Sequence, residues 1–258
     1  MISTLRNSID NFRTGWLVQG SSCRAAMMEL PDTLYPFWKR SAGFEFKGIP
    51  QDAFFFIRAA EGLLLFFDCV RYSGKPCALP SKAADSVWHA WMRMEPKGLD
   101  EFCLKHFGRR IPHVEATDMT AQMEDALANC LVQARWLERK PEAGTSLPRL
   151  FALDRKLKMP GGFGYKIVAG EVAFSHMDER GAPCGDVFYP GSLAPAQLLV
   201  AGLITQGTYD DYVQRAMRDS KGGGCGSAIT ATACDGGGDG GGSGCGSSCG
   251  GGGCGGGS

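Results

Sequence analysis

The chain has 258 residues and a formal net charge of zero, with 27 basic and 27 acidic side chains. Affinity for nucleic-acid phosphates depends on clustered lysine and arginine, so this balance argues against a dedicated nucleic-acid-binding protein. Glycine is concentrated at one end, because residues 222–258 hold 19 of the 37 glycines and five of the 11 cysteines. The chain therefore divides into a body, residues 1–221, and a tail, residues 222–258.

The start of the chain lacks the features of a secretory signal. Arg6, Asp10 and Arg13 interrupt it, so we expect the protein in the cytosol. The most apolar stretch, residues 53–67, falls short of the ~20 residues that a membrane span needs, and we expect no membrane span. In a reducing cytosol the cysteines of the body are expected to be thiols that pack as small apolar side chains; they are Cys23, Cys69, Cys77, Cys103, Cys130 and Cys184.

The first predicted elements are helices. A helical pattern between residues 21 and 39 is divided by two prolines. A stronger helix opens at residues 50–52 and runs to about Val70, and it is apolar on nearly every side, which predicts a place at the centre of the core. Its Arg58 and Glu61 are three residues apart, a spacing that suits an ion pair.

Three more helices follow along the chain. Ser81 has the features of an N-cap, and the helix after it ends before Pro96. A helix over residues 97–107 stops at Gly108, which fits a C-cap glycine. A long amphipathic helix is predicted over residues 119–140.

Glycine and proline become more frequent beyond residue 146. Residues 147–157 have a helical pattern, and the segments 165–168 and 171–174 predict a β-hairpin around Ala169-Gly170. Two closing helices, separated at Gly207, are predicted over residues 196–205 and 209–218.

Together these elements predict a mainly α fold with about seven or eight helices and one small β-hairpin. They form a single helical domain over residues 1–221, which could divide into two lobes, 1–140 and 146–221. Glycine-rich chain loses much backbone entropy on ordering and has no apolar face to bury. The tail, residues 222–258, is therefore predicted to be disordered.

A segment in the middle of the body carries several uncommon residue types in a fixed order. It runs from Pro80 to His89 as Pro-Ser-Lys-Ala-Ala-Asp-Ser-Val-Trp-His and continues with Phe102-Cys103, Phe107-Gly108 and Ile111-Pro112-His113. Over residues of about 61–115, and in its Gly/Cys-rich tail, the chain resembles the glycine-rich domain-containing protein family, which has no established chemistry. Many relatives place a second histidine two residues after the first, where this chain has Trp91, so the resemblance implies one metal ligand fewer here.

Three of the four histidines and one cysteine lie within 25 residues and could form a zinc site, since zinc prefers imidazole nitrogen and thiolate sulfur. The candidate ligands are His89, Cys103, His106 and His113. A competing interpretation pairs His89 with Asp85 one turn earlier and packs Cys103 in the core. A nucleophile pair of Cys103 and a histidine is a weaker alternative, because no motif flanks the cysteine.

The tail cysteines are predicted to be exposed thiols. They could bind soft metal ions, be oxidised or be modified after translation. The alternative is a low-complexity extension with no specific ligand. The residues concerned are Cys225, Cys234, Cys245, Cys249 and Cys254.

These observations favour a non-catalytic interaction or scaffold protein, whose body binds a protein partner and whose tail extends thiols into solvent. The first alternative is a metal-binding protein that holds zinc in the His/Cys cluster of the body or in the tail cysteines. The second alternative is a precursor whose Gly/Cys tail is modified after translation. The residues alone identify no partner and no substrate.

Overall fold

The computed structural model describes residues 21–113, 123–139 and 146–221. Within them the longest helix, α4, spans Ala53–Ser73. The Asp52 side chain caps it by accepting a hydrogen bond from the Phe55 N–H at 2.9 Å, and the helix ends at Gly74, whose φ of 62° is left-handed. The predicted central helix is thus confirmed, together with its ion pair, in which Arg58 Nη1 lies 2.6 Å from Glu61 Oε2.

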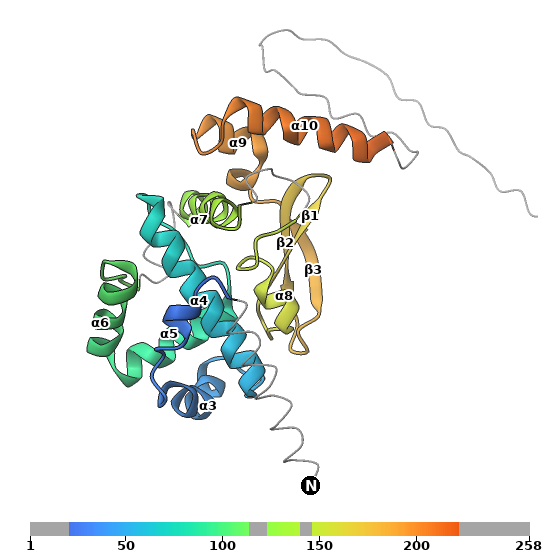
Figure 1. The fold of residues 1–258 in the computed structure, drawn as a ribbon. Helices are drawn as coiled ribbons and strands as arrows, with labels where there is room; N and C mark the ends of the chain where they lie inside the picture. The colour runs from blue at the N-terminus through green and yellow to red at the C-terminus, as the bar shows by residue number, and fades with distance from the viewer. Residues whose placement is uncertain (1–20, 114–122, 140–145, 222–258) are drawn as a thin grey trace, which may run out of the picture. The chain divides into compact units, whose positions relative to one another are not determined.

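Five further helices belong to the same helical region, and α4 packs against several of them (Figure 1). The contact between α3 and α5 is centred on Trp38, which is fully buried and donates its indole N–H to Ser86 Oγ at 3.0 Å. This bond satisfies a polar group that burial would otherwise leave without a partner. The five helices are α2 (Arg24–Met27), α3 (Leu34–Glu45), α5 (Lys82–Met94), α6 (Pro96–Phe107) and α7 (Met123–Leu137).

The predicted helix caps are confirmed. Ser81 Oγ accepts a hydrogen bond from the Ala84 N–H at 3.2 Å, and Gly108 ends α6 with a φ of 74°. Pro36 does not divide α3, because it lies in the first turn, where no intrahelical N–H bond is lost. The helix continues to Glu45, beyond the predicted end at residue 39. Of the predicted helix 119–140, residues 119–122 and residue 140 lie outside the described residues.

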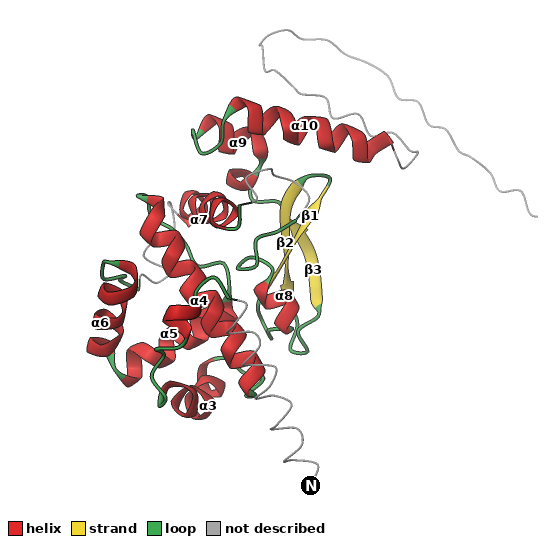
Figure 2. Ribbon diagram, in the orientation of Figure 1, coloured by secondary structure: helices red, strands yellow, loops and turns green. Residues whose placement is uncertain are grey.

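The β element is larger than predicted. Strands β1 (Phe163–Val168) and β2 (Glu171–Met177) form the expected antiparallel hairpin, and its two turn residues have positive φ, as a type I′ turn requires. A third strand, β3 (Pro183–Phe188), pairs with the other side of β2, so the sheet has the order β1-β2-β3 (Figure 2). Strand β3 was not predicted, because its proline and glycine indicate a loop, although an edge strand tolerates both.

The later helices also differ from the prediction. Helix α8 covers only Leu153–Leu157, since the residues before it form turns. Helix α9 is Pro195–Val200, after a short 3₁₀ turn at Gly191–Leu193, and α10 is Gln206–Lys221. Gly207 therefore lies inside a helix and not between two. The described residues contain nine α-helices and one small sheet, so the fold class is mainly α, as predicted.

The described residues all belong to one compact unit by their contacts. The predicted disordered tail, 222–258, lies outside the described residues, as does the start of the chain to residue 20. Among the helices that the structure describes, none has both the length and the hydropathy to span a bilayer.

Candidate metal centre

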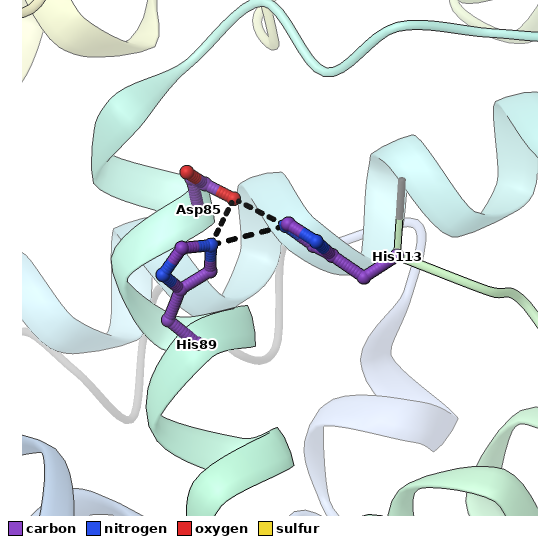
Figure 3. A group of neighbouring side chains, drawn as sticks. All are labelled: Asp85, His89 and His113. Atoms are coloured by element: carbon purple, nitrogen blue, oxygen red, sulfur yellow. Dashed lines mark hydrogen bonds and ion pairs between the residues drawn. The ribbon is translucent and has the colours of Figure 1, made fainter. Parts of the chain in front are cut away.

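Three side chains from two parts of the helical region converge. Asp85 and His89 lie one turn apart on α5, and Asp85 Oδ1 is 3.5 Å from His89 Nε2. His113, in the segment that follows α6, places its Nε2 3.1 Å from Asp85 Oδ1 and 3.1 Å from His89 Nε2. Figure 3 shows the three side chains directed at a common point. Their three ligating atoms form a nearly equilateral triangle.

This group, Asp85, His89 and His113, is called the triad below. The ligating atoms of the three side chains all lie within 4.8 Å of one another, and no second group of three or more His, Cys, Asp or Glu meets this criterion among the described residues. Its side chains are partly exposed, at 29%, 20% and 14% in chain order. The triad is therefore shielded from bulk water and still open to a small ligand.

Glu45, the last residue of α3, orients the His89 ring. Its Oε1 lies 2.5 Å from His89 Nδ1, and its Oε2 accepts a hydrogen bond from Arg93 Nη2 at 2.8 Å. A carboxylate at Nδ1 favours the tautomer with the proton on Nδ1 and leaves the Nε2 lone pair free. Because Nε2 faces Asp85 and His113, that lone pair is directed into the triad.

Trp88 provides an aromatic wall for His113. The His113 ring meets it edge to face, with 4.6 Å between the ring centroids and an interplanar angle of 80°. Trp88 is itself buried and packs against Phe67, with ring centroids 5.1 Å apart. The position of the His113 ring is thus tied to the core helix α4, and not only to its own loop.

Asp154 anchors the first turn of the helix that carries the triad. Its buried carboxylate accepts hydrogen bonds from Ser81 Oγ at 2.6 Å and from the N–H groups of Lys82, Ala83 and Phe163 at 3.0 Å each. Burial raises the pKa of this carboxyl, and the four donors oppose that increase. One side chain therefore joins α8, the N-terminus of α5 and strand β1.

The triad lines a cleft of about 1130 Å³. Its lining includes Trp88 and the triad from the helical region and aromatic rings of the sheet, among them Phe163, Phe174 and Phe188. Lys82 also lines the cleft, with its Nζ 5.4 Å from the centre of the Phe163 ring. The lining thus combines polar groups that suit a cation with aromatic groups that suit an apolar ligand.

Of the four ligands predicted from the sequence, the structure brings together His89 and His113. Cys103 is buried at 1% exposure in α6, and burial raises its pKa to about 12, which is opposite to the activation that a nucleophile or a metal-ligating thiolate needs. His106 lies in a separate surface group, where its Nε2 is 3.0 Å from Glu29 Oε2. Neither residue joins the triad.

Two contributors were absent from the predicted ligand set. Asp85 was expected only as a partner of His89, although its spacing of four residues already places both on one helix face. Glu45 has no such signal, because it is 44 residues from His89 in the chain. Only the packing of α3 against α5 brings it to the site.

Comparison with known proteins places the chain in a family. The profile of the UCP032817-like family matches residues 57–187, slightly more than half of the chain. The chain belongs to the UCP032817-like family. The matched segment contains the whole triad, Asp154, strands β1 and β2, and β3 up to Val187, whereas Glu45 and the Gly/Cys tail lie outside it.

No curated protein matches the chain. No solved structure matches it either. The resemblance to glycine-rich domain-containing proteins stays a prediction.

Proposed function

We propose that this protein binds a zinc ion through Asp85 Oδ1, His89 Nε2 and His113 Nε2. The observation that carries the proposal is the size of the triangle, with edges of 3.1, 3.1 and 3.5 Å. Tetrahedral zinc with bonds of about 2.0–2.1 Å holds its ligand atoms about 3.3–3.4 Å apart. The triad therefore has the spacing of three corners of a zinc tetrahedron.

Hydrogen bonding alone accounts poorly for this arrangement. When His89 is neutral and its Nδ1 proton is directed at Glu45, its Nε2 is an acceptor, and Asp85 Oδ1 is also an acceptor. A single proton on His113 Nε2 can point at only one of them, which leaves at least one close contact between two acceptors. A cation at the centre of the triad is attracted by all three atoms.

The three ligands leave one tetrahedral position, and the cleft provides space for it. Zinc sites with three protein ligands commonly keep the fourth position for water or a ligand, and there the ion acts as a Lewis acid. A small molecule with a carbonyl or carboxylate group could bind the ion and place an apolar part against Phe163 and Phe174. Two imidazoles and one carboxylate also suit non-haem iron(II). If the bound metal proves to be iron, the proposed ligands stay the same and only the identity of the metal changes.

The test is the metal content of the full-length protein and of three single variants. His89→Ala and His113→Ala remove ligands, whereas His106→Ala is the matched control, since His106 is a partly buried histidine that pairs with a carboxylate outside the triad. We expect about one zinc equivalent in the wild type and in the control, and a loss of that equivalent in the two ligand variants. Circular dichroism checks that each variant is folded.

Cobalt(II) substitution distinguishes metal binding at the triad from metal binding at the tail cysteines. Cobalt bound by nitrogen and oxygen lacks the sulfur-to-metal charge-transfer band that thiolate ligands produce. We expect d–d absorption without that band, and we expect it to disappear in His113→Ala. Equal zinc content in all four proteins, or a cobalt spectrum dominated by thiolate, would contradict the proposal.

The interaction or scaffold role predicted from the sequence stays a prediction, and so does modification of the tail. The two ideas differ from the zinc proposal in what they require. A scaffold needs its partner surface and not the triad, so His89→Ala and His113→Ala would bind a protein partner as well as the wild type does. If the tail is modified after translation, the protein would show a mass change confined to residues 222–258.

A further inference from the structure

Three cysteine side chains meet where α4 and α7 pack together. Cys69 lies on α4 and Cys130 on α7, at 1% and 0% exposure, and Cys77 lies in the loop after α4. Cys77 is only partly buried and lines the cleft that also holds the triad. From the sequence these thiols were expected only to pack as small apolar side chains, because their wide spacing indicates no common site.

The loop that carries Cys77 is held against α7 by two hydrogen bonds. The Ala78 N–H donates to the Ala126 carbonyl at 3.1 Å, and Asn129 Nδ2 donates to the Pro76 carbonyl at 3.0 Å. These bonds flank Cys77 on both sides and hold it against the stretch of α7 that carries Cys130. Cys130 is close enough to both Cys69 and Cys77 for their thiols to shift its pKa, and it shifts the pKa of Cys77 in turn.

The pKa values of the two neighbouring thiols are shifted in opposite directions. The hydrogen bond from Cys130 lowers the pKa of Cys77, whereas burial raises the pKa of Cys130 well above that of an ordinary thiol. Cys130 therefore stays protonated at neutral pH. Of the two, Cys77 has the larger thiolate fraction and faces the cleft, and these are the properties of a thiol that reacts with oxidants.

We propose that Cys77 and Cys130 form a peroxide-sensitive thiol pair that closes to a disulfide. The Cys77 thiolate attacks one oxygen of hydrogen peroxide, the O–O bond breaks, and the products are the Cys77 sulfenic acid and hydroxide, which takes up a proton to become water. The Cys130 sulfur then attacks the Cys77 sulfur, the S–O bond breaks, and the Cys130 proton leaves with the hydroxyl as a second water. Both sulfur atoms are oxidised by one unit, and the peroxide is reduced.

The pair shares no residue with the triad. Loss of zinc binding would leave the thiol pair intact, and failure of the thiol pair would leave the zinc proposal intact. Cys77 lines the same cleft as the triad, so a disulfide to the buried Cys130 would join the loop of Cys77 covalently to α7 beside that cleft.

The experiment maps disulfides in the full-length chain. The protein is treated with hydrogen peroxide, free thiols are alkylated, and the protein is digested with trypsin without reduction. Cleavage releases Cys77 in residues 72–82 and Cys130 in residues 111–135, each with a single cysteine. We expect the linked pair of these peptides to exceed links between Cys77 and the exposed Cys184 by at least about tenfold, because a neighbouring thiol has a high effective concentration.

Two variants sharpen the test. Cys130→Ala should accumulate Cys77 sulfenic acid, which dimedone traps, and Cys77→Ser should leave Cys130 reduced, since Cys130 is shielded from peroxide. Cys184→Ala is the control and should leave the link unchanged. Cys77 links distributed evenly over Cys184 and the tail cysteines would overturn the proposal, as would a Cys130 disulfide that forms equally fast in Cys77→Ser. The Cys77→Ser result keeps the test valid if Cys130→Ala does not fold.

Discussion

Glu45 and His89 are 44 residues apart in the chain, and their side chains meet with 2.5 Å between Oε1 and Nδ1. The carboxylate comes from the last residue of α3 and the imidazole from the third turn of α5. Outer carboxylates of this kind fix the orientation and the basicity of a metal-ligating histidine. The contact therefore gives α3 a role in the candidate zinc site although α3 supplies no ligand.

Removal of this carboxylate should weaken zinc binding without abolishing it. We expect Glu45→Gln to lower zinc affinity by about 10-fold to 100-fold, because the amide keeps a hydrogen bond and loses the negative charge. Competition with a chromophoric chelator measures the change. Glu29→Gln is the matched control, since Glu29 makes a similar contact with His106 outside the triad. Equal losses in both variants would show that the effect is not specific to the site.

Zinc should leave the triad as the solution becomes more acidic. Imidazole nitrogen must be unprotonated to bind a metal ion, so protons compete with zinc at His89 and His113. The zinc affinity of the triad should therefore fall as the pH is lowered. Equilibrium dialysis at several pH values measures the dissociation constant. A dissociation constant that does not change with pH would argue against histidine ligands.

Asp154→Asn should destabilise the fold by about 2–4 kcal/mol. The carboxylate accepts four hydrogen bonds at a buried position, and the nitrogen of an asparagine amide cannot accept those made to one of its two oxygens. Urea unfolding followed by circular dichroism measures the free energy of unfolding. The control is Asp100→Asn on the surface of α6, whose ion pair with Arg110 is long, at 3.7 Å, and exposed. A loss no larger than that of the control would contradict the role of Asp154.

The alkylation rate of Cys77 should depend on Cys130. Because a hydrogen bond from Cys130 lowers the Cys77 pKa, the thiolate of Cys77 is populated at lower pH than that of an ordinary thiol. Its rate with iodoacetamide should therefore reach half of its maximum at a lower pH in the wild type than in Cys130→Ala. Cys103, with a pKa of about 12, should react slowly up to mildly alkaline pH in both proteins. Identical pH profiles for Cys77 in the two proteins would contradict the hydrogen bond.

Local sequence patterns were enough to predict much of the helical framework. The cap at Ser81 and the glycine at 108 act within one turn of the helix end that each defines, so their effect can be predicted from neighbours in the chain. The spacing of Asp85 and His89 is local in the same sense. Strand β3 was missed because its backbone is stabilised by pairing with β2, which no pattern within the strand encodes.

The amino-acid sequence by itself determined which side chains share a helix face and where several helices begin and end, because those properties depend on contacts a few residues apart. The tertiary structure decided which distant groups meet. Glu45 reaches His89 only through the packing of α3 on α5, His113 is held by the buried Trp88, and Cys77 reaches Cys130 because two hydrogen bonds hold its loop on α7. Such contacts form when separate apolar surfaces are buried together, and the spacing of residues along the chain does not specify them.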